Sequence, residues 1–374
     1  MRAWPGTSLL GLDPARSFAC PCRIARVRSR QGTQQPFRIL LGMALRALFI
    51  GGTGIISTEA ARRAVADGVE LTLLNRGQSS KRPVPEGARV LHADVRDPES
   101  VRAALGDEEF DAVVEFTAFT PEHVQADLDL FTGRTGQYVF ISSASAYQTP
   151  PTHLPVVEST PLRNPFWEYS RNKIACEDLL VRAYRDTGLP MTIVRPSHTY
   201  DATVVPMDGG WTVVDRMRRG LEVVVPGDGT SRWTITHSAD VAVGLVGLLG
   251  REEAIGEAFH ITGDEAPSWD QIFRAMARAA GVDEPRLVHV ASDAIAAADP
   301  ELGAGILGDK AHTMIFDNAK IRRLVPQFSP RIPFAAGARE IVAWHDADPA
   351  RRVVDTQFEA LTERLLEAYR PRPV

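Results

Sequence analysis

Residues 45–57 read Leu-Arg-Ala-Leu-Phe-Ile-Gly-Gly-Thr-Gly-Ile-Ile-Ser. The apolar run Leu45–Ile50 predicts a buried strand, and a helix is predicted over Ile55–Asp67. The glycine-rich turn between them lets backbone N–H groups approach a pyrophosphate at the positive end of the helix. Ser57 replaces the usual third glycine but is small enough for the helix to pack on the strand. A purely structural turn is the alternative, but the order of strand, turn and helix favours a dinucleotide site at Gly51, Gly52, Thr53, Gly54, Ile55 and Ile56.

Short apolar runs alternate with amphipathic stretches through the first half of the chain. Alternation of this kind is typical of a parallel sheet that is covered by helices on both faces. The sequence therefore predicts an α/β fold with a doubly wound, Rossmann-type sheet. Strands are predicted at 45–50, 70–75, 90–92, 111–116, 137–141 and 191–194, and helices at 55–67, 99–105, 121–131 and 168–187.

After Arg195 the alternation becomes irregular. We expect the Rossmann domain to comprise residues 43–200, with 232–262 returning to it, and the segments 201–231 and 263–374 to form a smaller, C-terminal substrate-binding lobe. Beyond residue 200, strands are predicted at 232–236 and 258–262, and helices at 238–249, 269–280, 335–345 and 356–369.

Residues 1–42 differ in composition from the rest of the chain, because they contain seven arginines and a single acid, Asp13. They have no helical or strand period, so we expect a disordered extension and interpret Met43 as the functional start. A targeting segment is the alternative. Cys20-Pro21-Cys22 has no second Cys or His pair nearby, so no metal site is predicted.

The remainder of the chain is acidic, since the net charge is −5 despite the basic extension. An acidic body argues against a general affinity for nucleic acid, which depends on basic patches. No run approaches the roughly 18 apolar residues of a membrane span, so we expect no membrane partner and a cytoplasmic location. Cys176 is the only cysteine after residue 22, which is compatible with a reducing compartment.

Asn75 and Arg76 end the second predicted strand, about twenty residues after the glycine turn, where NAD enzymes usually carry an acid for the ribose. An arginine there offers planar donors to a 2′-phosphate, so NADP is favoured over NAD, with a solvated basic loop as the alternative. Asp94 and Val95, after the third strand, are predicted to hold the adenine. The remaining cofactor contacts are assigned to Thr117, Ala118, Tyr169, Lys173 and Pro196.

Tyr169 and Lys173 lie four residues apart at the start of a predicted helix, which places them on one face. Tyr169 is the only tyrosine of the chain that has a lysine four residues later. A nearby ammonium favours the phenolate, so Tyr169 is a candidate general base on a hydroxyl whose carbon loses hydride. The alternative is a surface tyrosine beside a solvated lysine.

Serines 142, 143 and 145 follow the strand at 137–141, at the sheet edge where such folds bind ligands. Ser143 is the predicted catalytic partner, because its hydroxyl would donate to the developing carbonyl oxygen. Ser142 and Ser145 are the structural alternatives. No G-x-S-x-G surrounds them, which disfavours hydrolase chemistry.

Together, these motifs and Arg195-Pro196 resemble the NAD-dependent epimerase/dehydratase family of extended short-chain dehydrogenases, over about residues 44–265. The chain looks closest to the atypical branch related to the chloroplast stem-loop-binding proteins. The resemblance implies an NAD(P)-dependent oxidoreductase that acts on a sugar or nucleotide-sugar hydroxyl through a transient ketone. An RNA-binding or regulatory protein on the same fold is the alternative. We also expect a homodimer.

Some positions depart from the family pattern. Ala144 and Ser145 replace the Asp-Glu pair of sugar 4,6-dehydratases, so that elimination is not expected. Ser197-His198 replaces an Asn that commonly contacts a diphosphate. Arg232 matches the position from which the family reaches a substrate phosphate. Ser145, His198 and Arg232 are the predicted substrate contacts, with His198 either a second acid or base or a hydrogen-bonded loop residue.

Overall fold

The computed structural model describes residues 44–78 and 81–370. The predicted extension at 1–42, with Cys20 and Cys22, lies outside the described residues, as do Ser79 and Ser80. Within the described part of the chain, no helix combines the length and the apolar character that a membrane crossing requires.

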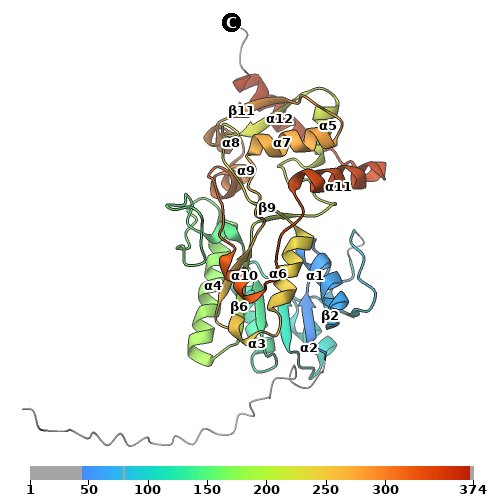
Figure 1. The fold of residues 1–374 in the computed structure, drawn as a ribbon, viewed down its shortest axis with the longest axis vertical. Helices are drawn as coiled ribbons and strands as arrows, with labels where there is room; N and C mark the ends of the chain where they lie inside the picture. Colours follow the sequence, from blue (N-terminus) through green and yellow to red (C-terminus); the bar gives the residue numbers. More distant parts are fainter. Residues whose placement is uncertain (1–43, 79–80, 371–374) are drawn as a thin grey trace, which may run out of the picture.

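A seven-stranded sheet forms the lower half of the molecule in Figure 1, and all its strand pairs are parallel. Its order is β10-β6-β5-β4-β1-β2-β3. The sheet confirms the predicted Rossmann-type fold. The strands are β1 (Arg46–Ile50), β2 (Glu70–Asn75), β3 (Arg89–His92), β4 (Ala112–Glu115), β5 (Tyr138–Ile141), β6 (Met191–Pro196) and β10 (Ala258–Ile261).

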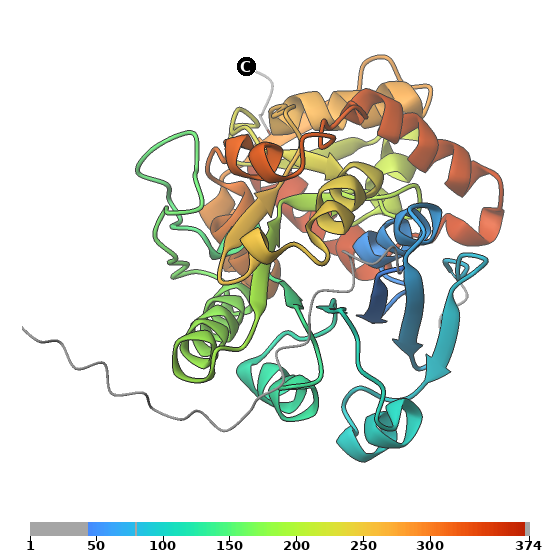
Figure 2. The ribbon, with the colours of Figure 1, turned by 60° about the horizontal axis from the view of Figure 1, so that its bottom comes forward.

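Helices cover both faces of the sheet, as Figure 2 shows. On one face, α1 (Ile55–Ala66), α6 (Ser238–Leu248) and α10 (Ala319–Leu324) pack through apolar side chains such as Ala61, Leu245 and Ile321. On the other face, α2 (Pro98–Leu105), α3 (Pro121–Phe131) and α4 (Glu168–Thr187) contribute Val101, Val124 and Leu180. Strands buried on both faces explain why these segments are continuously apolar in the sequence.

The second lobe lies above the sheet in Figure 1 and has its own core around Trp211, Trp233 and Trp269. Two short parallel pairs, β7 with β9 and β8 with β11, belong to this half of the chain. The elements are β7 (His198–Tyr200), α5 (Trp211–Arg218), β8 (Glu222–Pro226), β9 (Ile235–His237), α7 (Trp269–Ala279), β11 (Arg286–Val290), α8 (Ser292–Ala298), α9 (Pro300–Gly305), the π-helix η4 (Ile306–Lys310), α11 (Phe334–Asp346) and α12 (Thr356–Tyr369).

Two boundaries differ from the sequence-based expectation. The predicted lobe segment 263–374 includes α10, but Ile321, Val325 and Phe328 pack against α6 and the sheet, so the chain returns to the first domain here. The strand predicted at 232–236 begins later, because Arg232 and Trp233 make only isolated bridges to Ser268 and Met314.

Candidate active site

The glycine turn at the end of β1 is closed tightly by its neighbours. Gly51 has φ +87°, and a Cβ there would lie 2.2 Å from Cγ2 of Thr117. A Cβ on Gly52 would lie 2.7 Å from the side chain of Leu73. Ser57 replaces the third glycine with a hydroxyl that donates to the Gly51 carbonyl at 2.6 Å and accepts from the Gly54 N–H at 2.8 Å. The turn therefore exposes backbone rather than side chains at the N-terminus of α1, which has no acidic residue in its first turn.

The loops after β2 and β3 lie at the same edge of the sheet. Arg76 is exposed, and Oδ1 of Asn75 accepts the N–H of Gly77 at 2.9 Å. Oδ1 of Asp94 accepts the N–H of Arg96 at 3.0 Å, whereas the Arg96 guanidinium donates to the carbonyl of Thr117. These contacts connect the loop after β3, which contains the predicted adenine contacts Asp94 and Val95, to the loop after β4.

A buried carboxylate, Glu115, shapes the loop after β4, and sequence reasoning missed it. Its Oε1 accepts from the backbone N–H of Thr117, from the Thr117 hydroxyl at 2.7 Å and from the N–H of Ala118 at 2.7 Å. Burial raises the pKa of Glu115, and it also raises the pKa of Asp127, which accepts the Tyr138 hydroxyl at 2.7 Å. Glu115 therefore fixes the backbone of two predicted cofactor contacts.

Tyr169 and Lys173 project from the first two turns of α4, as the four-residue spacing predicts. The Lys173 Nζ donates to the backbone carbonyls of Ala118 at 2.8 Å and of Ile141 at 2.7 Å. It also lies 5.9 Å from the centroid of the Tyr169 ring. Trp167 packs on that ring at 4.7 Å between centroids. The helix and the ends of β4 and β5 thus fix both side chains.

Burial dominates the protonation of both groups. It raises the pKa of the Tyr169 hydroxyl to about 12, although a hydrogen bond with Ser143 acts in the opposite direction. It lowers the pKa of the Lys173 ammonium to about 8. Burial therefore raises the pKa of the Tyr169 phenol, in the direction opposite to the lowering expected from Lys173.

The three serines after β5 have different partners. The Ser142 hydroxyl donates to Glu177, which also forms a buried ion pair with Arg195. The Ser145 hydroxyl is buried and lies 2.9 Å from the Ser143 hydroxyl. Only Ser143 is half-buried and shares a hydrogen bond with the predicted base. The geometry favours Ser143 as the catalytic partner, which stays a prediction.

Two cavities share Ser143 and Tyr169 as lining residues. The first, about 240 Å³, is lined by Ile55, Ile56, Phe116, Phe119, Ile141, Ser142, Ser143, Tyr169, Lys173, Pro196, Ser197 and Thr199. The second, about 180 Å³, is lined by Ser143, Ala144, Ser145, Trp167, Tyr169, Pro196, Ser197, His198, Trp233 and Asp309. Ser143 and Tyr169 line both cavities, so the two residues lie between a space that includes the first residues of α1 and a space beneath the second lobe.

Of the three predicted substrate contacts, Ser145 and His198 line the second cavity, whereas Arg232 does not. The Arg232 side chain is exposed, and its Nε donates to the Ala266 carbonyl at 2.8 Å. Sequence reasoning missed Asp309, whose carboxylate lies 3.9 Å from Nδ1 of His198. No local pattern marks this residue, because it reaches the site from η4, a π-helix of the second lobe.

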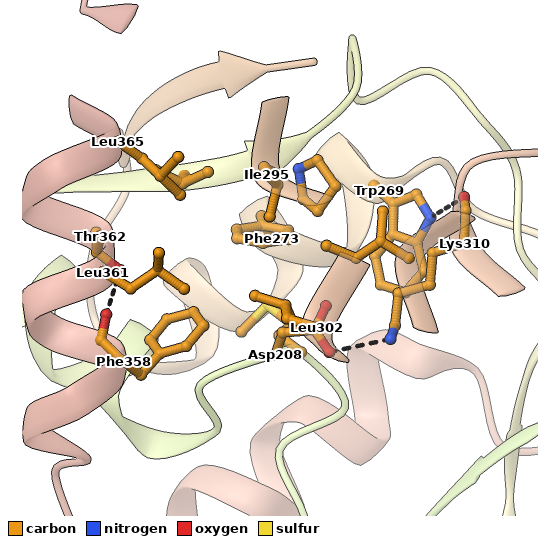
Figure 3. Close-up of a pocket in the computed structure, with 14 residues that line it drawn as sticks. Asp208, Trp269, Phe273, Ile295, Leu302, Lys310, Phe358, Leu361, Thr362 and Leu365 are labelled. Carbon is orange, nitrogen blue, oxygen red and sulfur yellow. Dashed lines mark hydrogen bonds and ion pairs between the residues drawn. The ribbon is translucent and has the colours of Figure 1, made fainter. Parts of the chain in front are cut away.

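Two further cavities continue into the second lobe. One of about 700 Å³ shares Trp167 with the second cavity of about 180 Å³, which we call the catalytic cavity. Its wall includes Asp208, Lys310 and Arg364. Beyond it lies a narrow apolar pocket between α7, α8 and α12, drawn in Figure 3, with the Lys310–Asp208 ion pair of 3.0 Å at one side. Trp167 therefore separates the cavity at Tyr169 from a larger space in the second lobe.

A profile of the NAD dependent epimerase/dehydratase family matches residues 47–262, which include the glycine turn, Ser143, Tyr169 and Lys173. The chain belongs to the NAD-dependent epimerase/dehydratase family. This confirms the resemblance that the motifs carry. The glycine turn, whose two Cβ positions are blocked, and the open N-terminus of α1 fit the nicotinamide dinucleotide that the family name implies.

Two proteins whose names describe different functions resemble the chain. It is 28% identical over 256 residues to chloroplast stem-loop binding protein of 41 kDa b from Arabidopsis thaliana, a match that covers 65% of each protein. It is 26% identical over 293 residues to 2'-dehydrokanamycin reductase from Streptomyces kanamyceticus, covering 77% of this chain and 81% of the reductase.

The fold is also shared with solved structures. An epimerase from Methanothermobacter thermautotrophicus superposes with a TM-score of 0.68 at 16% identity, covering 83% of this chain and 94% of the epimerase. At this identity the likeness shows the fold alone.

Proposed function

We propose that the protein is an NAD(P)-dependent oxidoreductase that interconverts a hydroxyl and a ketone on a sugar-like substrate. Tyr169, Lys173 and Ser143 are its proposed catalytic residues. The single observation that carries the proposal is the shared wall of the two cavities, since Ser143 and Tyr169 line both of them. A phenol between a dinucleotide site and a second cavity is placed to transfer a proton at a carbon that exchanges hydride with a nicotinamide.

Each residue has a distinct role in this proposal. Tyr169 takes the proton of the substrate hydroxyl during oxidation and returns it during reduction. Ser143 donates to the same oxygen and stabilises its developing charge. Lys173, held by two carbonyls, would hold the ribose of the cofactor. The bound cofactor supplies the hydride acceptor and a positive charge that favours the phenolate.

Arg76 supports a preference for NADP. It is exposed at the end of β2, where its guanidinium is free to approach a 2′-phosphate, and no acid occupies the position that usually binds the ribose of NAD. We propose a modest preference for NADP on this basis.

The relatives support several outcomes for the ketone. The reductase of 2'-dehydrokanamycin supports a net reduction or oxidation, and the UDP-glucose 4-epimerases among the relatives support return of hydride to the other face. Ala144 and Ser145 disfavour sugar dehydration, because neither side chain is a carboxylate. The cavities beneath the second lobe are the proposed substrate site, and a homodimer remains a proposal.

The test is a search for cofactor-dependent oxidation. The purified protein is incubated with NADP or NAD and a panel of sugars, amino sugars and nucleotide sugars, while absorbance at the reduced-nicotinamide band is followed and bound molecules are identified by mass spectrometry. We expect the protein to oxidise at least one compound, and we expect the Ser143→Ala variant to lose this activity. If RNA is retained in a salt-dependent way and no cofactor binds, the alternative supported by the chloroplast relative is correct instead.

A further inference from the structure

Asp309 faces the catalytic cavity with an incompletely satisfied carboxylate. Its side chain is only 10% exposed, and its Oδ2 lies 3.9 Å from Nδ1 of His198, within ion-pair range but too far for a hydrogen bond. In the part of the chain that the structure describes, no hydrogen bond reaches this carboxylate. A largely enclosed carboxylate without hydrogen-bond donors is costly, so the position points to a donor that comes with the substrate.

The carboxylate also acts on the proposed base. Asp309 and Tyr169 line the same cavity, and the negative charge of Asp309 contributes to the raised pKa of the Tyr169 hydroxyl. A cation bound at Asp309 would offset this effect. Substrate binding and activation of the base would then favour one another.

Within residues 44–78 and 81–370, the catalytic cavity offers an anionic substrate neither lysine nor arginine, and the histidine in its wall, His198, lies 3.9 Å from the Asp309 carboxylate. Arg232, the residue expected to reach a substrate phosphate, lies outside and donates to a backbone carbonyl. Trp233, which lines the cavity, has an indole N–H that is buried without a hydrogen-bond partner in the described structure, but this is a neutral donor.

The adjoining cavity continues the same charge pattern. Four of its lining residues are acids, namely Asp208, Asp299, Glu301 and Asp355. Lys310 and Arg364 are its two cations, and Lys310 is already paired with Asp208 at 3.0 Å. Asp299 and Asp355 also cap helices through one oxygen, which leaves the other available. A pyrophosphate in this space would meet more acids than free cations.

We infer that the substrate carries a protonated amine that binds Asp309, so that it is an amine-bearing glycoside and not a nucleoside-diphosphate sugar. This deepens the proposed function and rests on it for the reaction at Tyr169. The ammonium donates to the Asp309 carboxylate while the reacting hydroxyl lies at Tyr169 and Ser143. Further amines of a larger glycoside would reach the carboxylates beyond Trp167.

The test compares three probes on the cofactor-loaded protein: a glucosamine disaccharide, its N-acetylated form and UDP-glucose. Acetylation removes the positive charge and keeps the ring hydroxyls. We expect calorimetry to show that the amine form binds at least about 10-fold more tightly than the acetylated form, and that Asp309→Asn removes this ratio. Asp283→Asn, which removes an exposed carboxylate of the same lobe, is the matched control and should keep the ratio.

The outcomes separate the inference from the proposed function. Tighter binding of UDP-glucose, no binding of the amine probe, or an unchanged ratio in Asp309→Asn with an unchanged melting temperature would overturn the inference. Tyr169-dependent oxidation of UDP-glucose would overturn the inference of an amine-bearing substrate, but it would support the proposed function. Asp309-dependent amine binding without hydride transfer in either direction would support the site and contradict the proposed reaction.

Discussion

The ammonium of Lys173 donates a hydrogen bond to the backbone carbonyl of Ile141 at 2.7 Å, directly before the serines at the end of β5. A second bond, to the carbonyl of Ala118, joins it to the loop after β4. Lys173 thus links the two strand ends that carry most of the predicted site. The cost is the burial of a charge, which lowers its pKa to about 8.

This cost predicts a pH dependence of stability. Because the folded pKa of Lys173 is about 8 and its ordinary value is 10.5, the unfolded chain binds more protons between these values. The contribution of Lys173 to the free energy of unfolding therefore rises with pH in this window, by up to roughly 3 kcal/mol. Urea unfolding of the wild type and Lys173→Met at about pH 7 and about pH 10 measures it.

The control is Lys320→Met, which removes a surface lysine paired with Glu257 at 2.6 Å. Its pH dependence should follow the wild type. If Lys173→Met also followed the wild type, the ammonium would not be desolvated as the structure indicates.

The glycine turn predicts a specific steric effect. Gly51→Ala should remove cofactor binding, because the new Cβ would lie 2.2 Å from Cγ2 of Thr117. Gly68→Ala is the matched control, since Gly68 has a similar φ of +81° but nothing within 4 Å of its Cβ position. That variant should lose only about 1 kcal/mol of stability and keep its cofactor affinity. Fluorescence titration and thermal unfolding give both quantities.

A second change should rescue the first. Thr117→Ser removes the clashing methyl and keeps the hydroxyl that donates to Glu115. The double variant should bind the cofactor better than Gly51→Ala alone. Binding that is equally poor in both would show that the clash with Thr117 is not the cause.

Cofactor choice depends on Arg76 in this account. Arg76→Ala should weaken NADP binding by about 1.5–3 kcal/mol, the scale of a charge-assisted hydrogen bond, and leave NAD binding nearly unchanged. Calorimetric titration of both cofactors measures the difference. Tighter binding of NAD than of NADP by the unmutated protein would refute the proposed preference.

The hydrogen bond between Ser143 and Tyr169 predicts a shifted pH–rate profile. A general base must be deprotonated, so oxidation should accelerate with rising pH up to the pKa of Tyr169 in the complex. Ser143 lowers that pKa, so in Ser143→Ala the rise should move to higher pH and the rate should fall by about 10²–10³-fold. A profile with an unchanged midpoint would exclude this role.

The sequence predicts the first domain well, because its strands are buried on both faces and its helices are amphipathic. The helices at Pro121–Phe131 and Glu168–Thr187 have the predicted bounds. The second lobe is less predictable, because β8 and β11 pair across about sixty residues, and tertiary contacts rather than local pattern set such pairs.

The residues of the candidate site are likewise predictable only where a local sequence motif marks them. Tyr169, Lys173 and Ser143 follow from local motifs, and the fold brings them together at the ends of β5 and α4. Asp309 comes from a π-helix more than a hundred residues away in the sequence, and Glu115 is an acid within an apolar strand. Neither has a spacing signal, because only the folded chain defines their neighbours.

The most direct test of the central claim is single-turnover reduction of the cofactor by Tyr169→Phe, with the first compound found to be oxidised. The ring can still pack between Trp167 and Phe119, so folding and cofactor affinity should stay nearly unchanged. The account predicts that the rate of hydride transfer falls by about 10²–10⁴-fold, as expected for loss of a general base. A rate above roughly a tenth of the wild-type value would contradict it, because the hydroxyl of Tyr169 would then not be the base.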